Sequence, residues 1–487
     1  MSHLESSGLL YPESITKKND WNGIRINYKM LGLGLTKYIP LFAYIICVVC
    51  FILTIFYKTE IGLYLVTLLI PLQNLMDKLQ VFPFGKDIMD IFMLAFLSII
   101  IISKKENSLD DKFVNRAIML LIFTSYSALW VGSFKFGLPY PISVNDEQFV
   151  AWKNFIMLPL LYFVTLNIVE NKKQIMILIW IMVIALILMD VNFYQNTKWF
   201  TYEHFSEDKR AVGSTFTYLG PNEIAAFYAQ ITVFLIGFFL CDNVKVRRML
   251  FLIVVVFNFH CLLYLFSRGG YLSAVVGLIF LGVFKKRLLL VFLILLMFSW
   301  TVLLPQSVVE RIEMTRTDEG LDQSSQSRIE MWSQALRSVA LNPLTGIGFD
   351  NTQYLGIRSA KGIRKSVHNG YLKVLVEQGF IGLGIFLIVF YTAMKKGWSL
   401  FRQSDDLQMK GLGLGFVAMI VANLVGNLTG DKWSYFNAMG YFWILFGLVV
   451  KANQISLAEK KDTISVIETR VSTFGQKKDL TTNGHEC

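Results

Sequence analysis

A histidine and an arginine stand at the ends of apolar segments, where helix packing requires neither residue type. His368 comes just before the apolar run that follows Tyr371, and Arg268 lies between two apolar runs with almost no loop around it. An imidazole can take up or release a proton near neutral pH, and a guanidinium can donate two parallel hydrogen bonds to a phosphate. These residues therefore predict a general base and an anion-binding site at a membrane boundary.

Further polar residues fit a site for an anionic headgroup. Asn222 follows a Gly-Pro pair, which predicts that it enters an apolar helix in the first turn, where free N–H groups favour anions. Arg210 lies upstream and can fold over that turn. Arg328, near the start of a predicted amphipathic helix, is either structural or a secondary phosphate contact. Arg364 belongs to a basic stretch that either gathers a headgroup or forms a solvated face.

Plainer interpretations remain open for each of these residues. Arg210 and Arg268 also fit arginines that extend their side chains to lipid headgroups at the interface. A lone histidine such as His368 is commonly a packed core residue. Trp332, on the predicted amphipathic helix, fits a packing or interface anchor better than a platform for stacking a sugar.

The composition indicates an all-α integral membrane protein. Hydrophobic residues make up 54% of the 487 residues, and the mean hydropathy is +0.51. Because a bilayer core needs about 20 apolar residues per helix, we expect about 12 to 14 transmembrane helices. Residues 1–37 form a polar N-terminal segment, 38–450 the membrane domain, and 451–487 a polar tail that we expect to be cytoplasmic and disordered.

The formal net charge of +11 is explained by membrane topology and does not indicate a nucleic-acid partner. Lys and Arg cluster in four short stretches, at 172–173, 245–248, 285–287 and 395–396, which the positive-inside rule places in the cytoplasm. The intervening segments, including a large loop at 305–370, then face the other side. Ser324 or Ser325 can cap a helix in this loop that runs to about Leu341, with an apolar face from Ile329 to Val339.

Several motifs are missing from the sequence. There is no D-x-D, no G-x-x-x-x-G-K-[ST] and no H-E-x-x-H, and the histidines and cysteines have no metal-ligand spacing. We therefore expect no metal and no cofactor, and neither a P-loop ATPase nor a zincin.

The order of these pieces resembles the O-antigen ligase and O-antigen polymerase superfamily, which comprises bacterial polytopic membrane glycosyltransferases. The resemblance covers roughly residues 200–390. The matching residues are Arg210, Gly213, Pro221, Asn222, Ser267, Arg268, Gly269, Arg328, Trp332, Pro343, Gly346, Gly348, His368, Asn369, Gly370, Tyr371, Leu372, Leu375, Glu377, Gly379 and Gly382.

The resemblance implies a glycan donor linked to undecaprenyl pyrophosphate and a multi-pass protein of the bacterial inner membrane with its site facing the periplasm. Arg210 and Arg268 would hold the pyrophosphate and stabilise its charge, and His368 would be the general base. Asn222, Arg328, Arg364 and Asn369 are the candidate substrate-binding residues. The reaction would be metal-independent and inverting.

The acceptor stays open at this stage. A ligase would use lipid A–core, whereas a polymerase would use another lipid-linked glycan in O-antigen or exopolysaccharide assembly. The alternative function is a transporter of polysaccharide or lipid-linked oligosaccharide, which would need charges deep in the bundle and two related halves. A structural membrane scaffold is a third reading.

Overall fold

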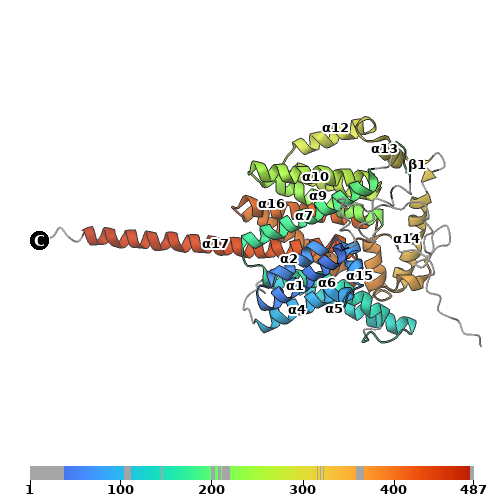
Figure 1. Ribbon diagram of the computed structural model, residues 1–487, viewed down its shortest axis with the longest axis horizontal. Helices are drawn as coiled ribbons and strands as arrows, with labels where there is room; N and C mark the ends of the chain where they lie inside the picture. Colours follow the sequence, from blue (N-terminus) through green and yellow to red (C-terminus); the bar gives the residue numbers. More distant parts are fainter. Residues whose placement is uncertain are drawn as a thin grey trace, which may run out of the picture.

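The computed structural model is a bundle of helices from which one long helix projects (Figure 1). The expected class, an all-α integral membrane protein, is confirmed, and the only strands among the described residues form a two-residue antiparallel pair. The structure describes residues 38–103, 111–143, 146–198, 203–206, 210, 220–314, 316–317, 320–321, 323–357 and 367–482.

Helices carry almost all of the described chain. The first part contains α1 (Ile39–Phe56), α2 (Glu60–Leu69), α3 (Gln73–Leu79), η2 (Gly85–Asp87), α4 (Ile88–Ile102), α5 (Lys112–Phe136), α6 (Glu147–Ile168) and α7 (Lys172–Thr197). The second part contains α9 (Pro221–Cys241), α10 (Lys245–Tyr264), α11 (Arg268–Phe284), α12 (Leu288–Leu303), α13 (Gln306–Glu313), β1 (Arg316–Thr317), β2 (Gly320–Leu321), α14 (Gln323–Leu341), η3 (Thr352–Leu355), α15 (Gly370–Gln403), α16 (Leu407–Leu428) and α17 (Phe436–Thr482).

Nine of the helices in the described chain are long and apolar enough to cross a membrane. The helices α12 and α13 meet at a bend of 106° and give a tenth span if they count as one. The helices α2 and α11 are apolar but shorter. The expected total of about 12 to 14 is therefore reached only if short helices also cross. The count falls because α2, α4, α11 and α12 have 10, 15, 17 and 16 residues, which is short for a span.

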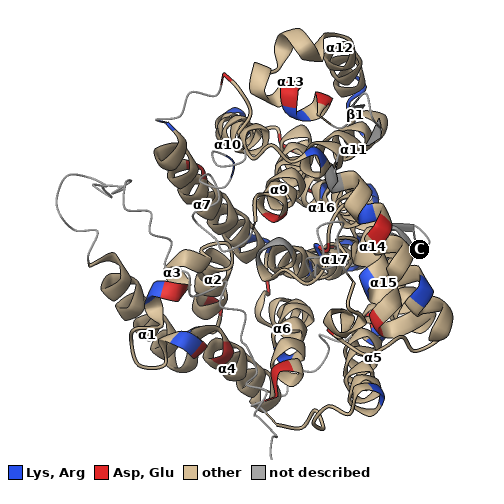
Figure 2. Cartoon of the chain, turned by 90° about the vertical axis from the view of Figure 1, so that its right-hand side faces the viewer, with Lys and Arg blue, Asp and Glu red and all other residues tan. Residues whose placement is uncertain are grey.

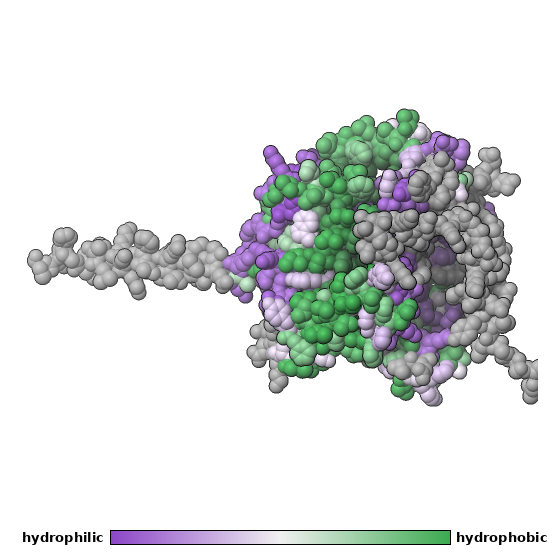
Figure 3. All heavy atoms as spheres, viewed as in Figure 1, coloured by the Kyte–Doolittle hydropathy of each residue, from purple (hydrophilic) through white to green (hydrophobic). Residues whose placement is uncertain are grey.

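On the face seen in Figure 3, hydrophobic residues form a band across the bundle, with hydrophilic residues on either side of it. One end is where α17 leaves the bundle, and Lys172, at the start of α7, contacts Asp406 at 3.4 Å and Glu459 on α17 at 2.7 Å there. The opposite end carries α13, β1 and α14 (Figure 1). All the candidate site residues that the structure describes belong to this opposite end.

Glycines bring α9, α11 and α16 into close contact at the centre of the bundle. A Cβ atom built on Gly237 of α9 would lie 2.5 Å from the Cα of Gly415 on α16, and one on Gly415 would lie 2.4 Å from the carbonyl oxygen of Phe234. A Cβ on Gly270 of α11 would lie 2.9 Å from the Cβ of Ala225. Small residues let backbones approach in this way in membranes, so the three helices have a nearly fixed spacing.

The predicted amphipathic helix of the large loop is present as α14, and it packs against α15 (Figure 2). Its buried face consists of Met331, Ala335 and Val339, which are at most 7% exposed. Val339 of the predicted apolar face is thus buried, whereas Ile329 and Leu336 of that face are 52% and 53% exposed. Two apolar stripes run along this helix, and the stripe containing the small Ala335 permits the closer approach.

α15 is broken near its start. Gly379 has φ +64° and ψ −167°, a conformation that glycine adopts without a Cβ penalty. A Cβ there would lie 2.2 Å from the carbonyl oxygen of Leu344. The Phe380 N–H donates to the carbonyl of Pro343 at 2.8 Å, so the segment that follows α14 is bonded into the break.

The polar tail that follows residue 450 contains most of α17, and its cytoplasmic location stays a prediction. α17 continues as helix to Thr482 and projects away from the bundle (Figure 1), while residues 483–487 and the polar segment 1–37 lie outside the described residues. Extending a helix that is already nucleated in the membrane domain avoids the cost of nucleation, and residues 451–482 contain no proline.

We expect Gly415→Ala to destabilise the protein by about 1 to 3 kcal/mol, because its methyl group has to displace backbone atoms of α9. Gly384→Ala is the matched control, since a Cβ at this α15 position meets nothing within 4 Å and alanine favours helix by up to about 1 kcal/mol. Thermal unfolding of the purified proteins in detergent measures both. Equal melting temperatures for the two variants would contradict the packing argument.

Candidate active site

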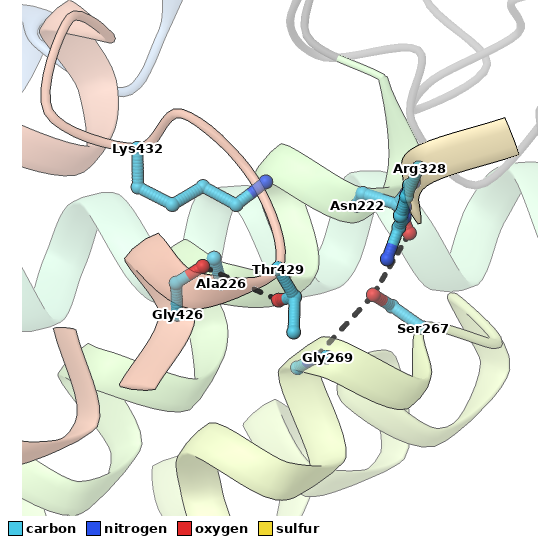
Figure 4. Close-up of a pocket in the computed structure, with 9 residues that line it drawn as sticks. Asn222, Ala226, Ser267, Gly269, Arg328, Gly426, Thr429 and Lys432 are labelled. Carbon is cyan, nitrogen blue, oxygen red and sulfur yellow. Dashed lines mark hydrogen bonds between the residues drawn. The ribbon is translucent and has the colours of Figure 1, made fainter. Parts of the chain in front are cut away.

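A small pocket lies between the ends of α9, α11, α14 and α16 (Figure 4). Its volume of about 10 Å³ holds about one water. Most of its exposed lining is polar. The residues that line it are Asn222, Ala226, Ser267, Gly269, Gly270, Arg328, Gly426, Thr429 and Lys432.

One wall is the N-terminus of α11. Ser267 is its N-cap and accepts a hydrogen bond from the Gly270 N–H at 3.4 Å, which is a usual role for serine. Its hydroxyl donates to Oδ1 of Asn222, in the first turn of α9, at 2.9 Å. Gly269 fits against Thr429 because a Cβ would lie 2.3 Å from the threonine hydroxyl. Backbone N–H groups of a helix start therefore face the pocket beside a fixed amide.

Arg210 stands behind this wall. Its guanidinium donates to Oδ1 of Asn222 at 2.6 Å and to the carbonyl of Leu265 at 3.0 Å, and the residue is 7% exposed. A buried guanidinium needs such acceptors to offset its lost hydration. Arg210 and Ser267 thus both donate to one amide oxygen, which fixes the orientation of Asn222 in the pocket.

α13 holds the two segments that carry the arginines. Arg311 donates to the carbonyl of Phe266 at 3.2 Å and lies over the ring of Phe205, 4.6 Å from its centroid. Glu310 accepts from the Phe205 N–H at 2.9 Å and contacts Nδ1 of His204 at 2.8 Å. These contacts tie the residues before Arg210 to those just before Arg268.

Arg328 and Lys432 also face the pocket. Lys432 is 2% exposed, and its ammonium lies 3.3 Å from Oε1 of Glu223. Burial lowers the pKa of Lys432, Glu223 raises it, and the nearby charge of Arg328 lowers it. Two cations and one carboxylate thus meet at the end of the bundle.

His368 lies close to this region but is not among the residues that line the pocket. It has φ +51°, which is uncommon for a residue other than glycine. Its neighbours are fixed on both sides: the Val367 carbonyl accepts from Trp332 Nε1 at 3.0 Å, and Asn369 caps α15 by accepting from the Leu372 N–H at 3.0 Å. Trp332 therefore acts in packing, as the sequence suggested.

Contacts connect His368 with the pocket through α16. A Cβ on Gly370 would lie 2.3 Å from Oδ1 of Asn427, and the same oxygen accepts from the backbone N–H of Lys432 at 3.1 Å. The start of the helix that follows His368 and the loop that carries Lys432 thus share one asparagine.

A second charged group adjoins this loop. Lys373, in the first turn of α15, donates to Asp431 at 2.8 Å and to Ser434 at 3.3 Å, and lies 3.9 Å from Asp350. Burial raises the pKa of Asp431, but the charge and hydrogen bond of Lys373, the Ser434 hydroxyl and the charge of Lys432 together outweigh it, and the net pKa is lowered. The adjacent residues Asp431 and Lys432 therefore have different partners, which are Lys373 and Glu223 respectively.

The structure brings together only part of the predicted site. Asn222 and Arg328 line the pocket, Arg210 supports Asn222, and Asn369 is a helix cap whose Oδ1 is already used. Arg268 is the first residue of α11, between two lining residues, without lining the pocket itself. Arg364 lies outside the described residues.

Sequence reasoning missed Lys432 and Lys373. Lys432 directly follows Asp431 in a short turn between two apolar runs, which is the same signal that singled out Arg268. An adjacent acid is also typical of a solvated turn, so the signal is weaker. Lys373 lies within an apolar helix start, and its acidic partner is distant in sequence.

We expect Glu310→Ala to speed hydrogen exchange at the Phe205 amide, because this change removes the acceptor of that N–H. Hydrogen–deuterium exchange with mass spectrometry at neutral pH measures it. The Phe205 N–H and His204 lower the pKa of Glu310, so the wild-type contact is present above the ordinary glutamate pKa and is lost as pH falls through the lowered value. Glu313→Ala, at an exposed position of α13, should leave this amide unchanged, and equal effects would count against the contact.

Lys373→Met should reverse the pH dependence of stability. The lowered pKa of Asp431 means that wild type keeps this stabilisation above the ordinary aspartate pKa and loses it as pH falls through the lowered value. Without Lys373 the buried carboxylate has no cation at 2.8 Å, which costs about 3 to 5 kcal/mol near neutral pH and less once Asp431 is protonated. Melting temperatures between about pH 4 and pH 8 test this; a variant that follows the wild-type curve would exclude the pairing as a source of stability.

A sequence model of the O-antigen ligase family matches residues 228–387. The matched range includes Arg268, Arg328 and His368, whereas Arg210 and Asn222 precede it and Lys432 follows it. A comparison with curated proteins found none that matches this chain. The match agrees with the ordered motifs of the sequence and with a multi-pass helical membrane architecture. Over these residues the chain is therefore similar to the O-antigen ligase family.

Proposed function

We propose that this protein transfers a glycan from an undecaprenyl-pyrophosphate-linked donor to a sugar hydroxyl at the periplasmic face of the bacterial inner membrane. The family match supports glycan transfer in O-antigen assembly. The observation that carries the finer proposal is the pocket itself, where Arg328, Lys432 and the N-terminus of α11 converge at the end of apolar helices. That combination suits a diphosphate whose lipid tail stays in the membrane.

The charge distribution supports this orientation. The four basic clusters occur near helix ends, and Lys172 places one of them beside α17 at the end opposite the pocket. The positive-inside rule assigns that end to the cytoplasm. The pocket then opens toward the periplasm, where glycans are joined after their lipid carrier has crossed the membrane.

Each arginine has a distinct part in donor binding. Arg268 is the first residue of α11, between two residues that line the pocket, and Arg328 lines it from α14. Both arginines are therefore assigned to the phosphate oxygens. Arg210 already donates to Asn222 and Leu265, so it positions Asn222 and adds positive potential from behind the wall. Arginine charge in a partly dehydrated site stabilises the negative charge that develops on the leaving diphosphate.

The chemical step uses His368 as general base. Its imidazole takes the proton from the acceptor hydroxyl as the hydroxyl oxygen bonds to the anomeric carbon. The bond from that carbon to the diphosphate oxygen breaks, and its electron pair stays on the diphosphate. One displacement inverts the configuration. The contacts of Val367 and Asn369 hold His368 between two fixed neighbours for this role.

We expect His368→Ala to abolish transfer while the protein still inserts into the membrane, because the change removes the base and leaves the helix cap at Asn369 intact. The surface-glycan profile of cells whose only copy carries this variant measures it, with expression checked by blot. Single repeats on lipid A–core would identify a polymerase, and long chains stranded on undecaprenyl pyrophosphate would identify a ligase.

His485→Ala, which changes a histidine near the end of the sequence, is the control and should keep the wild-type profile. An unchanged profile for His368→Ala would rule out His368 as the base. If Arg268→Ala were also silent, a transporter would explain the protein better than an enzyme.

A further inference from the structure

The backbone of Lys432 is fixed at the pocket, whereas its side chain can change its contact. Its backbone N–H is fixed by Asn427, while its ammonium folds back over Gly430, where a Cβ would lie 2.6 Å from the lysine nitrogen. Figure 4 shows the side chain extending into the pocket toward the α9 wall. A fixed backbone with a flexible four-carbon chain can redirect its charge without moving the loop.

The ion pair with Glu223 is a loose one. The distance of 3.3 Å exceeds the about 2.7 to 2.9 Å typical of strong charge-assisted hydrogen bonds. Glu223 is next to Asn222 in the first turn of α9, so its carboxylate lies at the edge of the same pocket. The positive charge of Arg328 also acts on Lys432. An anion placed between the two cations would remove their repulsion.

The pocket has a volume of about 10 Å³, which is room for about one water. A diphosphate has several oxygens and needs a larger space. Lys432 occupies part of the space. Binding of a diphosphate therefore requires a side chain to move, and Lys432 is the lining residue whose ammonium is held by a single carboxylate contact in the described structure.

We propose that Lys432 binds the diphosphate of the donor by exchanging its contact with Glu223 for a phosphate oxygen, so that Glu223 opposes donor binding. This inference rests on the proposed function. The donor diphosphate is linked at both ends and carries two negative charges, and it gains a third when the glycosyl bond breaks. A lysine released from its carboxylate supplies charge at that moment, together with Arg268 and Arg328.

The test measures binding of undecaprenyl diphosphate to the purified full-length protein in nanodiscs at about pH 6.5, well below the ordinary lysine pKa. Lys432→Met should weaken binding about tenfold. Glu223→Gln should strengthen it about threefold, because the competing carboxylate is gone. Lys432→Arg should stay within about threefold of wild type.

A purely structural ion pair predicts a different pattern. Glu223→Gln would then weaken binding or leave it unchanged while lowering the melting temperature, and either result overturns the proposal. Binding by Lys432→Met within about twofold of wild type overturns it as well. If Lys432→Met leaves Glu223 unpaired and fails to fold, the double variant Lys432→Met with Glu223→Gln removes both charges, and it should still bind about tenfold more weakly than wild type.

Raising the pH gives an independent readout. Because the pKa of Lys432 lies below the ordinary lysine value, wild-type binding should weaken as the pH is raised toward that ordinary value and the ammonium loses its proton. Lys432→Arg stays charged and should hold its affinity over this range. Identical pH profiles for the two proteins would overturn the proposal.

Two controls separate this inference from the proposed function. Lys395→Met removes an exposed cation near the other end of α15 and should bind normally. His368→Ala should bind undecaprenyl diphosphate like wild type but not transfer glycan. If wild type itself fails to bind undecaprenyl diphosphate, the proposed function fails together with this inference. If wild type binds and Lys432→Met binds equally well, only the role of Lys432 is lost.

Discussion

The spacing of α9, α11 and α16 is the constraint on which the site depends. Gly237 and Gly415 allow backbone contact between α9 and α16, and Gly270 allows α11 to approach α9. Close backbone packing is an effective way to hold helices together in lipid, where the hydrophobic effect offers little between them. Because the pocket walls are the ends of these same helices, their spacing sets the distance between the anion-binding groups.

The charges at this end of the bundle are arranged around shared acceptors. One amide oxygen, on Asn222, receives hydrogen bonds from both Arg210 and Ser267, and another, on Asn427, receives the N–H of Lys432 while packing against Gly370. One amide oxygen can thus orient two neighbouring groups. This matters in a buried region, where each polar group without a hydrogen bond lowers the stability of the fold. The neutral amide of Asn222 also holds the Arg210 guanidinium without neutralising it, which leaves that positive charge beside the pocket for an anionic substrate.

Local sequence signals predicted the parts of the fold and site that depend on neighbouring residues. The start of α9 at Pro221 follows from the Gly-Pro pair, and α14 ends at the predicted Leu341. Its start was misplaced, because Ser324 and Ser325, the predicted caps, lie inside a helix that begins at Gln323. Asn222 and Arg328 were still placed near a helix start. The site position of Lys432 depends on a turn meeting α9, more than two hundred residues earlier, and no local pattern contains that information. Which stripe of α14 is buried could not be predicted from the sequence either. The helix has two apolar stripes, and the surface of α15 determines which one packs against it.

The break at Gly379 has a mechanical consequence. The carbonyls of Pro343 and Leu344 accept N–H groups of Phe380 and Ile381. The loop that follows α14 therefore supplies hydrogen-bond acceptors to the backbone of α15 at the break. Together with the bond from Trp332 to the Val367 carbonyl, this makes α14 and the opening turns of α15 one rigid piece. The amphipathic helix therefore cannot swing open as a lid while His368 stays in place, and a substrate must gain its room from side chains inside the pocket.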